Sequence, residues 1–315
     1  LVLWLDAADA VVDAENRVSQ WTDKSGNNNH ANQLTTNRQP KRINNSFNNL
    51  DGIKFDGTDD CLISIFPDTI SQPVNIFILF NYSGLTNKYI YDGINSTNRL
   101  ALWSNNNQLE QFSSGGSIRF SKSIPFNNVL ISSVFNGTSS KLFENTILKS
   151  SGNNGNTKSK GFTFGARYSL GSAFSGEINE VIIKQGFIDD NQRLLIENYY
   201  ISKYSSIISL GFDKISNNFC PINIMPIGTF VSCIWNNGSI DPSIEITKSG
   251  IYSIQAVNNL GIASIDSISI KFPTTLLNSS INVLCSNDSI ILSSQIENIN
   301  SFSYEWSNGA TTHEI

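Results

Sequence analysis

The stretch LWLDAAD at residues 3–9, followed by WTDKSGNNNHA at 21–31 and FDGTDD at 55–60, decides the fold class. Each segment begins with apolar and aromatic residues and ends in Asp, Gly or Asn, which accept the backbone conformations of tight turns at little cost. Short strands that end in polar turns indicate a β-rich domain. We therefore predict an all-β fold for this part of the chain.

Strand patterns of the same kind recur as far as residue 204. They cover residues 53–55, 61–65, 74–80, 88–91, 100–103, 117–120, 129–135, 141–144, 162–164 and 178–183. Ten or more short strands, separated by turn residues, favour a two-sheet jelly-roll sandwich, and such sandwiches commonly run to roughly 200 residues. We predict one jelly-roll domain over residues 1–205.

One helix is predicted near the end of this domain, over residues 189–204. Asp189 is placed to cap its first turn, and Gln192 occupies the capping-box position three residues later. Residues four positions apart predict one apolar stripe, made of Leu195 with Tyr199 and of Ile196 with Tyr200 and Tyr204. The helix is therefore expected to pack against the sandwich.

Five blocks occur together in a fixed order: residues 4–8, 21–30, 55–60, FSGEINEVI at 174–182 and NYYISKY at 198–204. In this combination the chain resembles the bacterial laminin-G-like domain, which has the concanavalin A-like lectin and glucanase fold. The resemblance covers about the first two-thirds of the chain. It implies a jelly roll and a role in carbohydrate binding or adhesion, as in surface adhesins associated with gliding motility.

The pattern changes after residue 205. Residues 206–273 are predicted to form one immunoglobulin-like β-sandwich repeat, and residues 274–315 a second, truncated copy. The repeated Trp-x-Asn-Gly motif at 235–238 and 306–309, with Glu-Ile at 245–246 and 314–315, indicates an internal duplication. The copies resemble the immunoglobulin-like or PKD-like repeats of large bacterial surface proteins, and such a layout implies an extended adhesin.

Four cysteines are too few for a disulfide scaffold in a chain of 315 residues. A bridge between Cys220 and Cys233 is one option, because both fall in the same repeat, although strands so placed often lie in opposite sheets. Cys285 is expected to pair beyond the truncated second copy. Cys61 is expected to be a small buried apolar residue.

Charge and composition exclude several classes of partner. A formal net charge of -5 without a run of Lys or Arg argues against nucleic acid and anionic membranes. The sequence has no stretch of roughly 18 apolar residues that would insert into a membrane. The surface is expected to be rich in Asn, Ser and Gly, which favours sugars or proteins as partners of a secreted or bacterial cell-surface protein.

Acid–base catalysis is not predicted. Retaining glucanases of the resembled fold carry an E-x-D-x-E strand, which places three acids on one face. This chain has Glu177, Asn179 and Glu180, so the middle acid is absent and the second glutamate points to the other face. The two histidines, His30 and His313, have no nucleophile nearby in sequence. We predict that the chain is not an enzyme.

Acidic turns suggest a structural Ca²⁺ site. The candidate ligands are Asp23, Asn27, Asp56, Asp59 and Asp60, in two turns that the resemblance places near each other. Ca²⁺ takes six to eight oxygen ligands, which carboxylates and amides supply. The alternative interpretation is that these side chains cap turns through backbone N–H groups.

Sugar binding needs aromatic faces beside polar groups, because pyranose rings stack on aromatics and hydroxyls take directional hydrogen bonds. The candidates are Tyr82, Trp103, Arg167 and Tyr168, and asparagines 81 and 105–107 flank two of them. Alternatively, each of these residues belongs to the core or to ordinary surface.

The sequence therefore favours a non-catalytic adhesion or carbohydrate-binding module of a large secreted bacterial protein. Its expected partners are a glycan or other cell-surface ligand and the other domains of the same chain. The first alternative is a structural spacer or protein-binding module of a surface filament. The second is a glycoside hydrolase of the concanavalin A-like fold, which would need two carboxylates roughly 5 to 9.5 Å apart in a cleft.

Overall fold

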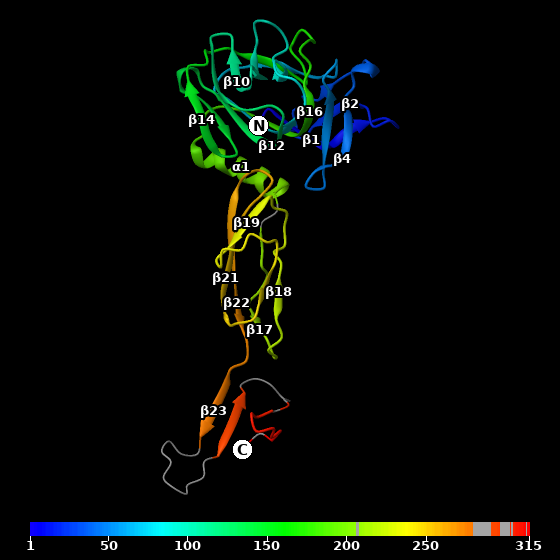
Figure 1. The fold of residues 1–315 in the computed structure, drawn as a ribbon. Coiled ribbons are helices and arrows are strands. Elements are labelled where there is room, and N and C mark those ends of the chain that lie inside the picture. Colours follow the sequence, from blue (N-terminus) through cyan, green and yellow to red (C-terminus); the bar gives the residue numbers. More distant parts are fainter. Residues whose placement is uncertain (206–207, 280–290, 297–302, 304, 313) are drawn as a thin grey trace. The chain divides into compact units, whose positions relative to one another are not determined.

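The computed structural model describes residues 1–205, 208–279, 291–296, 303, 305–312 and 314–315 (Figure 1). The chain divides into two compact units, which are described separately. Unit 1 contains Leu1–Ser206 and Asn259–Ile262, and unit 2 contains Ile207–Asn258 and Ala263–Ile315. Strands dominate both units, so the predicted all-β class is confirmed.

Unit 1 is a sandwich of antiparallel strands. Its strands are β1 (Leu3–Val12), β2 (Val18–Asp23), β3 (Ala31–Asn32), β4 (Lys41–Phe47), β5 (Leu50–Asp56), β6 (Leu62–Ile70), β7 (Val74–Tyr82), β8 (Tyr89–Asp92), β9 (Leu100–Ser104), β10 (Gln108–Ser113), β11 (Gly116–Ser121), β12 (Phe126–Phe135), β13 (Ser140–Glu144), β14 (Ile147–Gly152), β15 (Ser159–Phe164) and β16 (Ser175–Gln185). Two short 3₁₀ helices, η1 (Thr36–Arg38) and η2 (Gly137–Ser139), and one α-helix, α1 (Asp190–Tyr204), complete the unit.

The strand order is β11-β10-β9-β8-β15-β6-β3-β2-β1-β16-β7-β12-β13-β14, with the β4–β5 hairpin joined to β16. The end strands β11 and β14 contact each other, so the sheet folds into two layers (Figure 1). Alternation fixes which side chains lie between the layers, since neighbouring residues of a strand point to opposite faces. In β9, Leu100 and Leu102 belong to the shared core, whereas Trp103 points outward.

All ten strands predicted from sequence in this unit are present. The structure adds β3, β4, β10 and β14, which were not predicted. These four strands are short and rich in Asn, Gln, Ser, Lys or Gly, so their sequences lack a strong β signal, and hydrogen bonding to neighbouring strands decides their conformation.

Helix α1 packs on the outer face of the β7–β12–β16 half of the sandwich. Asp189 caps it as predicted, because its side chain accepts a hydrogen bond from the Gln192 backbone at 2.7 Å. The predicted apolar stripe is partly wrong, since Leu195 is 70% exposed. The buried face instead consists of Arg193, Glu197, Tyr200 and Tyr204.

This buried face tolerates charge because its ions are paired. Arg193 forms an ion pair with Glu197, and its guanidinium lies 3.9 Å from the ring centroid of Phe143. Ser132 of β12 donates to Glu197 at 2.6 Å. The sequence stripe omitted Arg193 and Glu197, because charged residues are rarely buried unless they are paired.

Unit 2 contains a four-stranded sheet and two two-stranded sheets. Its strands are β17 (Lys214–Ile215), β18 (Ile222–Ile224), β19 (Ser232–Trp235), β20 (Ile244–Ile246), β21 (Gly250–Val257), β22 (Ala263–Lys271), β23 (Thr275–Ser279) and β24 (Leu292–Ile296). The sheets are β17-β22-β21-β19, β18-β20 and β23-β24. Trp235, Ile254 and Ile268 lie in its core.

The two Trp-x-Asn-Gly segments adopt the same turn. The Gly238 N–H donates to the Trp235 carbonyl at 2.9 Å, and Gly309 donates to Trp306 at 2.8 Å. Both glycines have a φ of 85°. Each indole N–H also donates to the carbonyl six residues later, at 2.9 Å for Trp235 and 2.7 Å for Trp306. The division into two repeats at residue 273 stays a prediction.

The cysteines form no bridge in the described part of the chain. Cys220 and Cys233 are free thiols, so a Cys220–Cys233 bridge is wrong for this structure. Cys233 instead lies 3.4 Å from the carbonyl of Asp241. Cys61 is buried as predicted. Cys285 lies outside the described residues.

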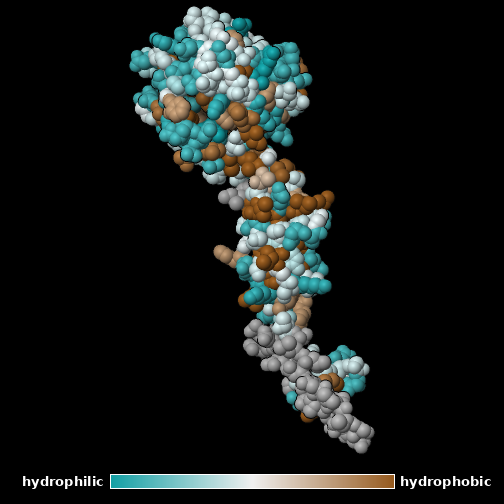
Figure 2. Space-filling model, turned by 90° about the vertical axis from the view of Figure 1, so that its left-hand side faces the viewer, coloured by the Kyte–Doolittle hydropathy of each residue, from teal (hydrophilic) through white to brown (hydrophobic). Residues whose placement is uncertain are grey.

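Hydrophilic residues cover most of unit 1 in the face shown by Figure 2, whereas apolar residues interrupt the surface of unit 2. The exposed large apolar residues of unit 2 include Phe212, Ile215, Met225, Ile227, Val231, Ile240, Ile251 and Ile265. Among the described residues, no helix is long and apolar enough to cross a bilayer.

Candidate functional site

An aromatic group lies on the outward face of strands β8 to β10. Trp103 of β9 and Tyr89 of β8 are register partners, and their rings stack with centroids 5.3 Å apart and planes 13° from parallel. Phe112 of β10 lies opposite Ala101, two residues before Trp103, so it shares this face. We call Tyr89, Trp103, Phe112 and Tyr168 the aromatic face.

A buried arginine holds the aromatic face together. The guanidinium of Arg99 lies 4.9 Å from the ring centroids of both Phe112 and Tyr168, and 5.6 Å from that of Tyr89. Asp92 accepts two hydrogen bonds from Arg99, at 3.0 and 2.9 Å. Burial lowers the pKa of Arg99, but the hydrogen bonds and charge of Asp92 raise it overall. Arg99 therefore stays charged and acts as a scaffold.

The loop after β15 brings Tyr168 to this face. The Tyr168 backbone N–H donates to Asp92 at 3.1 Å. Gly165 donates to Ile90 at 2.9 Å, and Phe174 donates back to Gly165 at 2.8 Å, which closes the loop at its base. The conformation is thus fixed by backbone hydrogen bonds at both ends.

Arg167 precedes Tyr168 in the same loop. Its guanidinium lies 5.1 Å from the Tyr168 ring centroid, and its Nε atom is shielded from solvent without a described acceptor. Trp103 also has a shielded indole N–H without a described acceptor. Contacts therefore run from Trp103 through Tyr89, Arg99 and Tyr168 to Arg167.

Three of the four predicted sugar-binding residues lie on or beside the aromatic face. These three are Trp103, Arg167 and Tyr168, and each is partly exposed. Tyr82 is 1% exposed, and its hydroxyl bonds Leu85 at 2.7 Å and Ser104 at 2.6 Å. Its ring packs in the core and presents no face to a ligand.

Sequence reasoning missed Tyr89, Arg99 and Phe112. Alternation supplied a usable signal in β9, because Leu100 and Leu102 are apolar and therefore place Arg99 and Trp103 together on the opposite face. No comparable signal marked Phe112, because strand β10 was not predicted.

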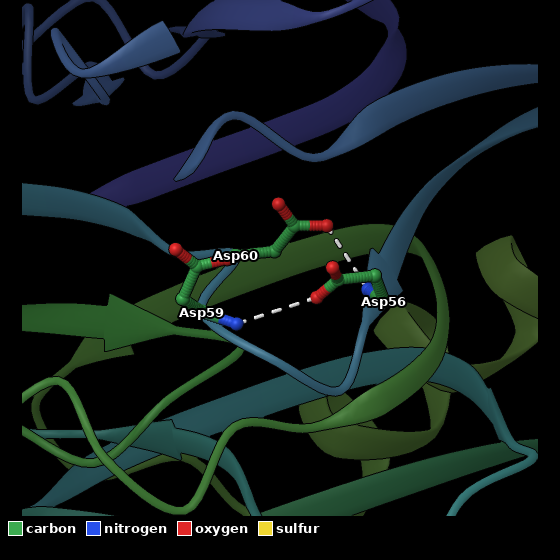
Figure 3. Close-up of side chains that lie close together, drawn as sticks. All are labelled: Asp56, Asp59 and Asp60. Atoms are coloured by element: carbon green, nitrogen blue, oxygen red, sulfur yellow. Dashed lines mark hydrogen bonds between the residues drawn. The ribbon is translucent and has the colours of Figure 1, made fainter. Parts of the chain in front are cut away.

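The acidic turn between β5 and β6 brings three aspartates together (Figure 3). Carboxylate oxygens of Asp56, Asp59 and Asp60 lie within 4.8 Å of one another. Asp56 accepts from the backbones of Thr58 at 2.8 Å and Asp59 at 3.4 Å, and Asp60 accepts from that of Asp56 at 3.0 Å. Each of these bonds caps the turn, as the alternative interpretation expected.

The electrostatics of this turn are unfavourable for three charges. Burial, followed by the negative charges of Asp56 and Asp59, raises the pKa of Asp60 from 3.8 to about 6, although the hydrogen bond from the Asp56 backbone and the charge of Lys41 oppose the shift. An open cavity of about 610 Å³ adjoins Asp56 and Asp60. The three carboxylates fit a divalent cation in charge and ligand type, with the remaining oxygens supplied by other groups. Calcium at this turn stays a prediction.

The other two predicted metal ligands have different roles. Asp23 accepts hydrogen bonds from the backbones of Trp4, Ser25 and Asn29 at 2.8 to 2.9 Å. Asn27 donates to the carbonyls of residues 1 and 2 at 3.1 and 3.2 Å. Asp23 is not among the carboxylates that gather at the turn of Asp56, Asp59 and Asp60.

The glutamates of β16 are held in separate hydrogen-bond networks. Glu177 accepts from Ser46 at 2.6 Å. Glu180 is fully buried and accepts from Tyr199 at 2.8 Å and from Lys203 at 2.7 Å. His30 accepts from the Asp23 backbone through Nδ1 at 2.9 Å, so it serves the same turn as Asp23. His313 lies outside the described residues.

No family model and no curated protein matches the chain. Among solved structures, it is similar to "Trypanosoma rangeli sialidase in complex with sialic acid" at 10% identity, with a TM-score of 0.46 over 62% of this chain and 32% of that one. It thus spans about a third of that sialidase chain.

Two further similar structures are a botulinum toxin domain and an arabinanase domain. "Botulinum neurotoxin serotype D binding domain" gives 13% identity and a TM-score of 0.49, over 96% of this chain and 79% of that one. Domain 4 of AbnA, an extracellular arabinanase from Geobacillus stearothermophilus in complex with arabinotriose, gives 15% and 0.46, over 61% and 95%. With TM-scores below 0.5, these similarities transfer neither a ligand nor an activity.

Proposed function

We propose that unit 1 is a non-catalytic carbohydrate-binding module of a secreted or surface-exposed protein, with its ligand on the aromatic face. The observation that carries the proposal is the Trp103–Tyr89 stack, in which Tyr89 also contacts the guanidinium of Arg99 and Trp103 presents a partly exposed indole. Sugar rings stack on such indole faces, while nearby polar groups orient the hydroxyls.

The carboxylates of β16 support a non-catalytic role. A glycosidase needs one carboxyl that donates a proton and a second that acts as nucleophile or base, on either side of the bond to be cleaved. Glu180 is buried beneath α1 and paired with Lys203. It therefore serves the packing of the helix instead of facing a substrate.

Shallow recognition on one open sheet face gives weak single contacts. Several copies of such a module on one surface convert weak contacts into avidity without any new contact. Adhesion through many copies is therefore the physiological role that we propose.

The test is a glycan array probed with the full chain and with Trp103→Ala. We expect binding to one glycan class and loss of most of the signal in Trp103→Ala, since stacking of a sugar ring depends on the indole face. Phe187→Ala is the matched control, because Phe187 is 74% exposed and lies beside Pro73 and Arg193 at the start of α1, not on strands β8 to β10.

Circular dichroism of both variants checks that the sandwich remains folded. A signal that survives in folded Trp103→Ala would remove this face as the binding site. Absence of signal for the wild-type chain on all glycans would instead favour the structural or protein-binding alternative.

A further inference from the structure

The arginines around the aromatic face differ in their charge balance. Arg99 is neutralised by Asp92 at 2.9 Å, and Arg119 of β11 lies 3.8 Å from Glu110 of β10. Arg167 has no carboxylate of a described residue within 4 Å. It is the one arginine of the seven in the chain for which this holds. The uncompensated guanidinium on this face is therefore that of Arg167.

The backbone places Arg167 before any ligand arrives. Its N–H donates to Gly171 at 2.9 Å and its carbonyl accepts from Leu170 at 2.7 Å, which closes a tight turn. Leu170 has a φ of 62°, and a branched residue holds this left-handed conformation only where the surroundings impose it. Because Tyr168 is tied to Asp92, the turn cannot rotate away from the aromatic face.

An unpaired guanidinium selects the chemistry of a ligand. Its planar set of N–H donors matches a carboxylate with two parallel hydrogen bonds, which are stronger than bonds to neutral groups. The chain carries a formal charge of -5, so it repels anions in general. A localised positive group beside stacked aromatic rings would therefore favour ligands that present an acidic group and a sugar ring together.

We propose that the aromatic face binds acidic saccharides, with Arg167 taking a sugar carboxylate while Trp103 stacks on a sugar ring. This inference rests on the proposed carbohydrate-binding function and adds the ligand class to it. Arg167 is a ligand-contacting residue here, whereas Arg99 only positions the rings.

The test is calorimetric titration of the full chain at low salt with paired probes. The first pair is trigalacturonic acid and its methyl ester, and the second is sialyllactose and lactose. Each pair differs by the charge or presence of the carboxylate. We expect the acid to bind roughly ten- to a hundred-fold more tightly than its neutral counterpart, as for a hydrogen-bonded charged group. The pair that shows the preference identifies the kind of acidic sugar.

Variants separate the inference from the function on which it rests. Arg167→Gln should remove the preference for the acid and retain neutral binding, and Arg167→Lys should retain part of the preference. Trp103→Ala should weaken both probes of a pair. Arg17→Gln is the control, because Arg17 pairs with Asp13 and Glu15 and lies on the β1–β2 connection.

Two results would overturn the inference while the proposed function stands: equal binding of acid and neutral probe, or an unchanged preference in Arg167→Gln. Failure of the wild-type chain to bind any of the four probes, together with silence on the glycan array, would overturn both.

Discussion

The indole Nε1 of Trp4 donates a hydrogen bond to Oε1 of Glu180 at 2.5 Å, joining the first strand to the last strand of the sandwich. Lys203 of α1 completes the network, at 2.6 Å from Asp6 and 2.7 Å from Glu180. Tyr199 donates to the same Glu180 oxygen as Trp4. Residues from three of the five blocks that carry the family resemblance therefore meet in a structural network that fixes the helix to the sheet.

Lys203→Met should destabilise unit 1 strongly. Burial lowers the pKa of Lys203, but hydrogen bonds with Asp6 and Glu180 raise it overall, so the ammonium is stabilised in the folded state. Methionine keeps the apolar stem but removes the counter-charge of buried Glu180 and leaves Asp6 with Lys24 alone, 3.4 Å away. We expect a loss of about 3 kcal/mol in the free energy of unfolding, measured by urea denaturation.

Lys160→Met is the matched control, because Lys160 is exposed on β15 and has no described ion pair. It should change the free energy of unfolding by less than about 0.5 kcal/mol. Equal stability of the Lys203 and Lys160 variants would show that the Lys203 network does not stabilise the fold.

Asp60→Asn should stabilise the protein in a pH-dependent way. Burial, with the charges of Asp56 and Asp59, raises the pKa of Asp60 from 3.8 to about 6 in the folded state. The folded protein therefore binds this proton more tightly than the unfolded chain does. The resulting stability is complete below about pH 4 and is lost as the pH rises through about 6.

Asparagine removes the charge yet can still accept from the Asp56 backbone. The variant should therefore gain up to about 3 kcal/mol at pH 8 and almost nothing at pH 4, when both proteins are measured with chelator present. Asp68→Asn, at an exposed position on β6, should leave the pH profile unchanged. A gain that is constant across this pH range would contradict the electrostatic explanation.

A calcium ion bound at the β5–β6 turn would make the loss of an aspartate charge unfavourable, which is opposite to the effect expected with chelator present. If Asp56, Asp59 and Asp60 coordinate Ca²⁺, millimolar calcium raises the melting temperature and a chelator reverses the rise, because a ligand that binds only the folded state stabilises it. Asp59→Asn should remove the rise, and Asp23→Asn should retain it, since Asp23 caps a different turn. The absence of a calcium-dependent shift in the wild-type protein would remove the metal from this site.

Local patterns were sufficient to predict the fold and part of the site. Short apolar segments predicted the strands and turn residues marked most strand ends, so the sandwich followed from short-range signals. Arg167 and Tyr168 follow β15 directly, which placed them together on a loop. Tyr82 could not be judged in this way, because nearly every residue of β7 is buried and alternation therefore carries no information there.

Contacts between distant residues were not predictable from one sequence. The Arg99–Asp92 ion pair depends on how β8 and β9 pair, and the pairing contains a register shift. Lys203 meets Asp6 across 197 positions. The three aspartates of the FDGTDD turn could be found because they are local, whereas Asp23 was grouped with them only through the family resemblance.

Helix α1 allows a direct comparison between the predicted and the observed buried face. Leu195→Lys should change the free energy of unfolding by less than about 0.5 kcal/mol, because Leu195 is 70% exposed. Tyr200→Phe should cost about 1 kcal/mol, because it removes only the hydrogen bond from the hydroxyl to the Phe77 carbonyl at 3.1 Å. Tyr200→Ala should cost about 3 to 5 kcal/mol, since it also leaves a cavity beneath the helix. A large loss in Leu195→Lys would restore the stripe that the sequence predicted.

The matching turns of unit 2 give the last prediction. Trp235→Phe keeps an aromatic ring in the core but removes the indole N–H that donates to the Asp241 carbonyl, so it should cost about 1 to 3 kcal/mol in the free energy of unfolding of unit 2. Gly238→Ala should cost about 1 kcal/mol, because the φ of 85° disfavours any residue with a Cβ atom.

Trp306→Phe and Gly309→Ala remove the same interactions from the second turn and should show the same order of effects. Hydrogen exchange of the amides at positions 238 and 309 measures the loss of stability that each substitution causes in its own turn. If the two turns are equivalent structural units, the loss from Trp→Phe divided by the loss from Gly→Ala is the same in both copies. A loss confined to one copy would show that the shared sequence motif has a structural role in that copy alone.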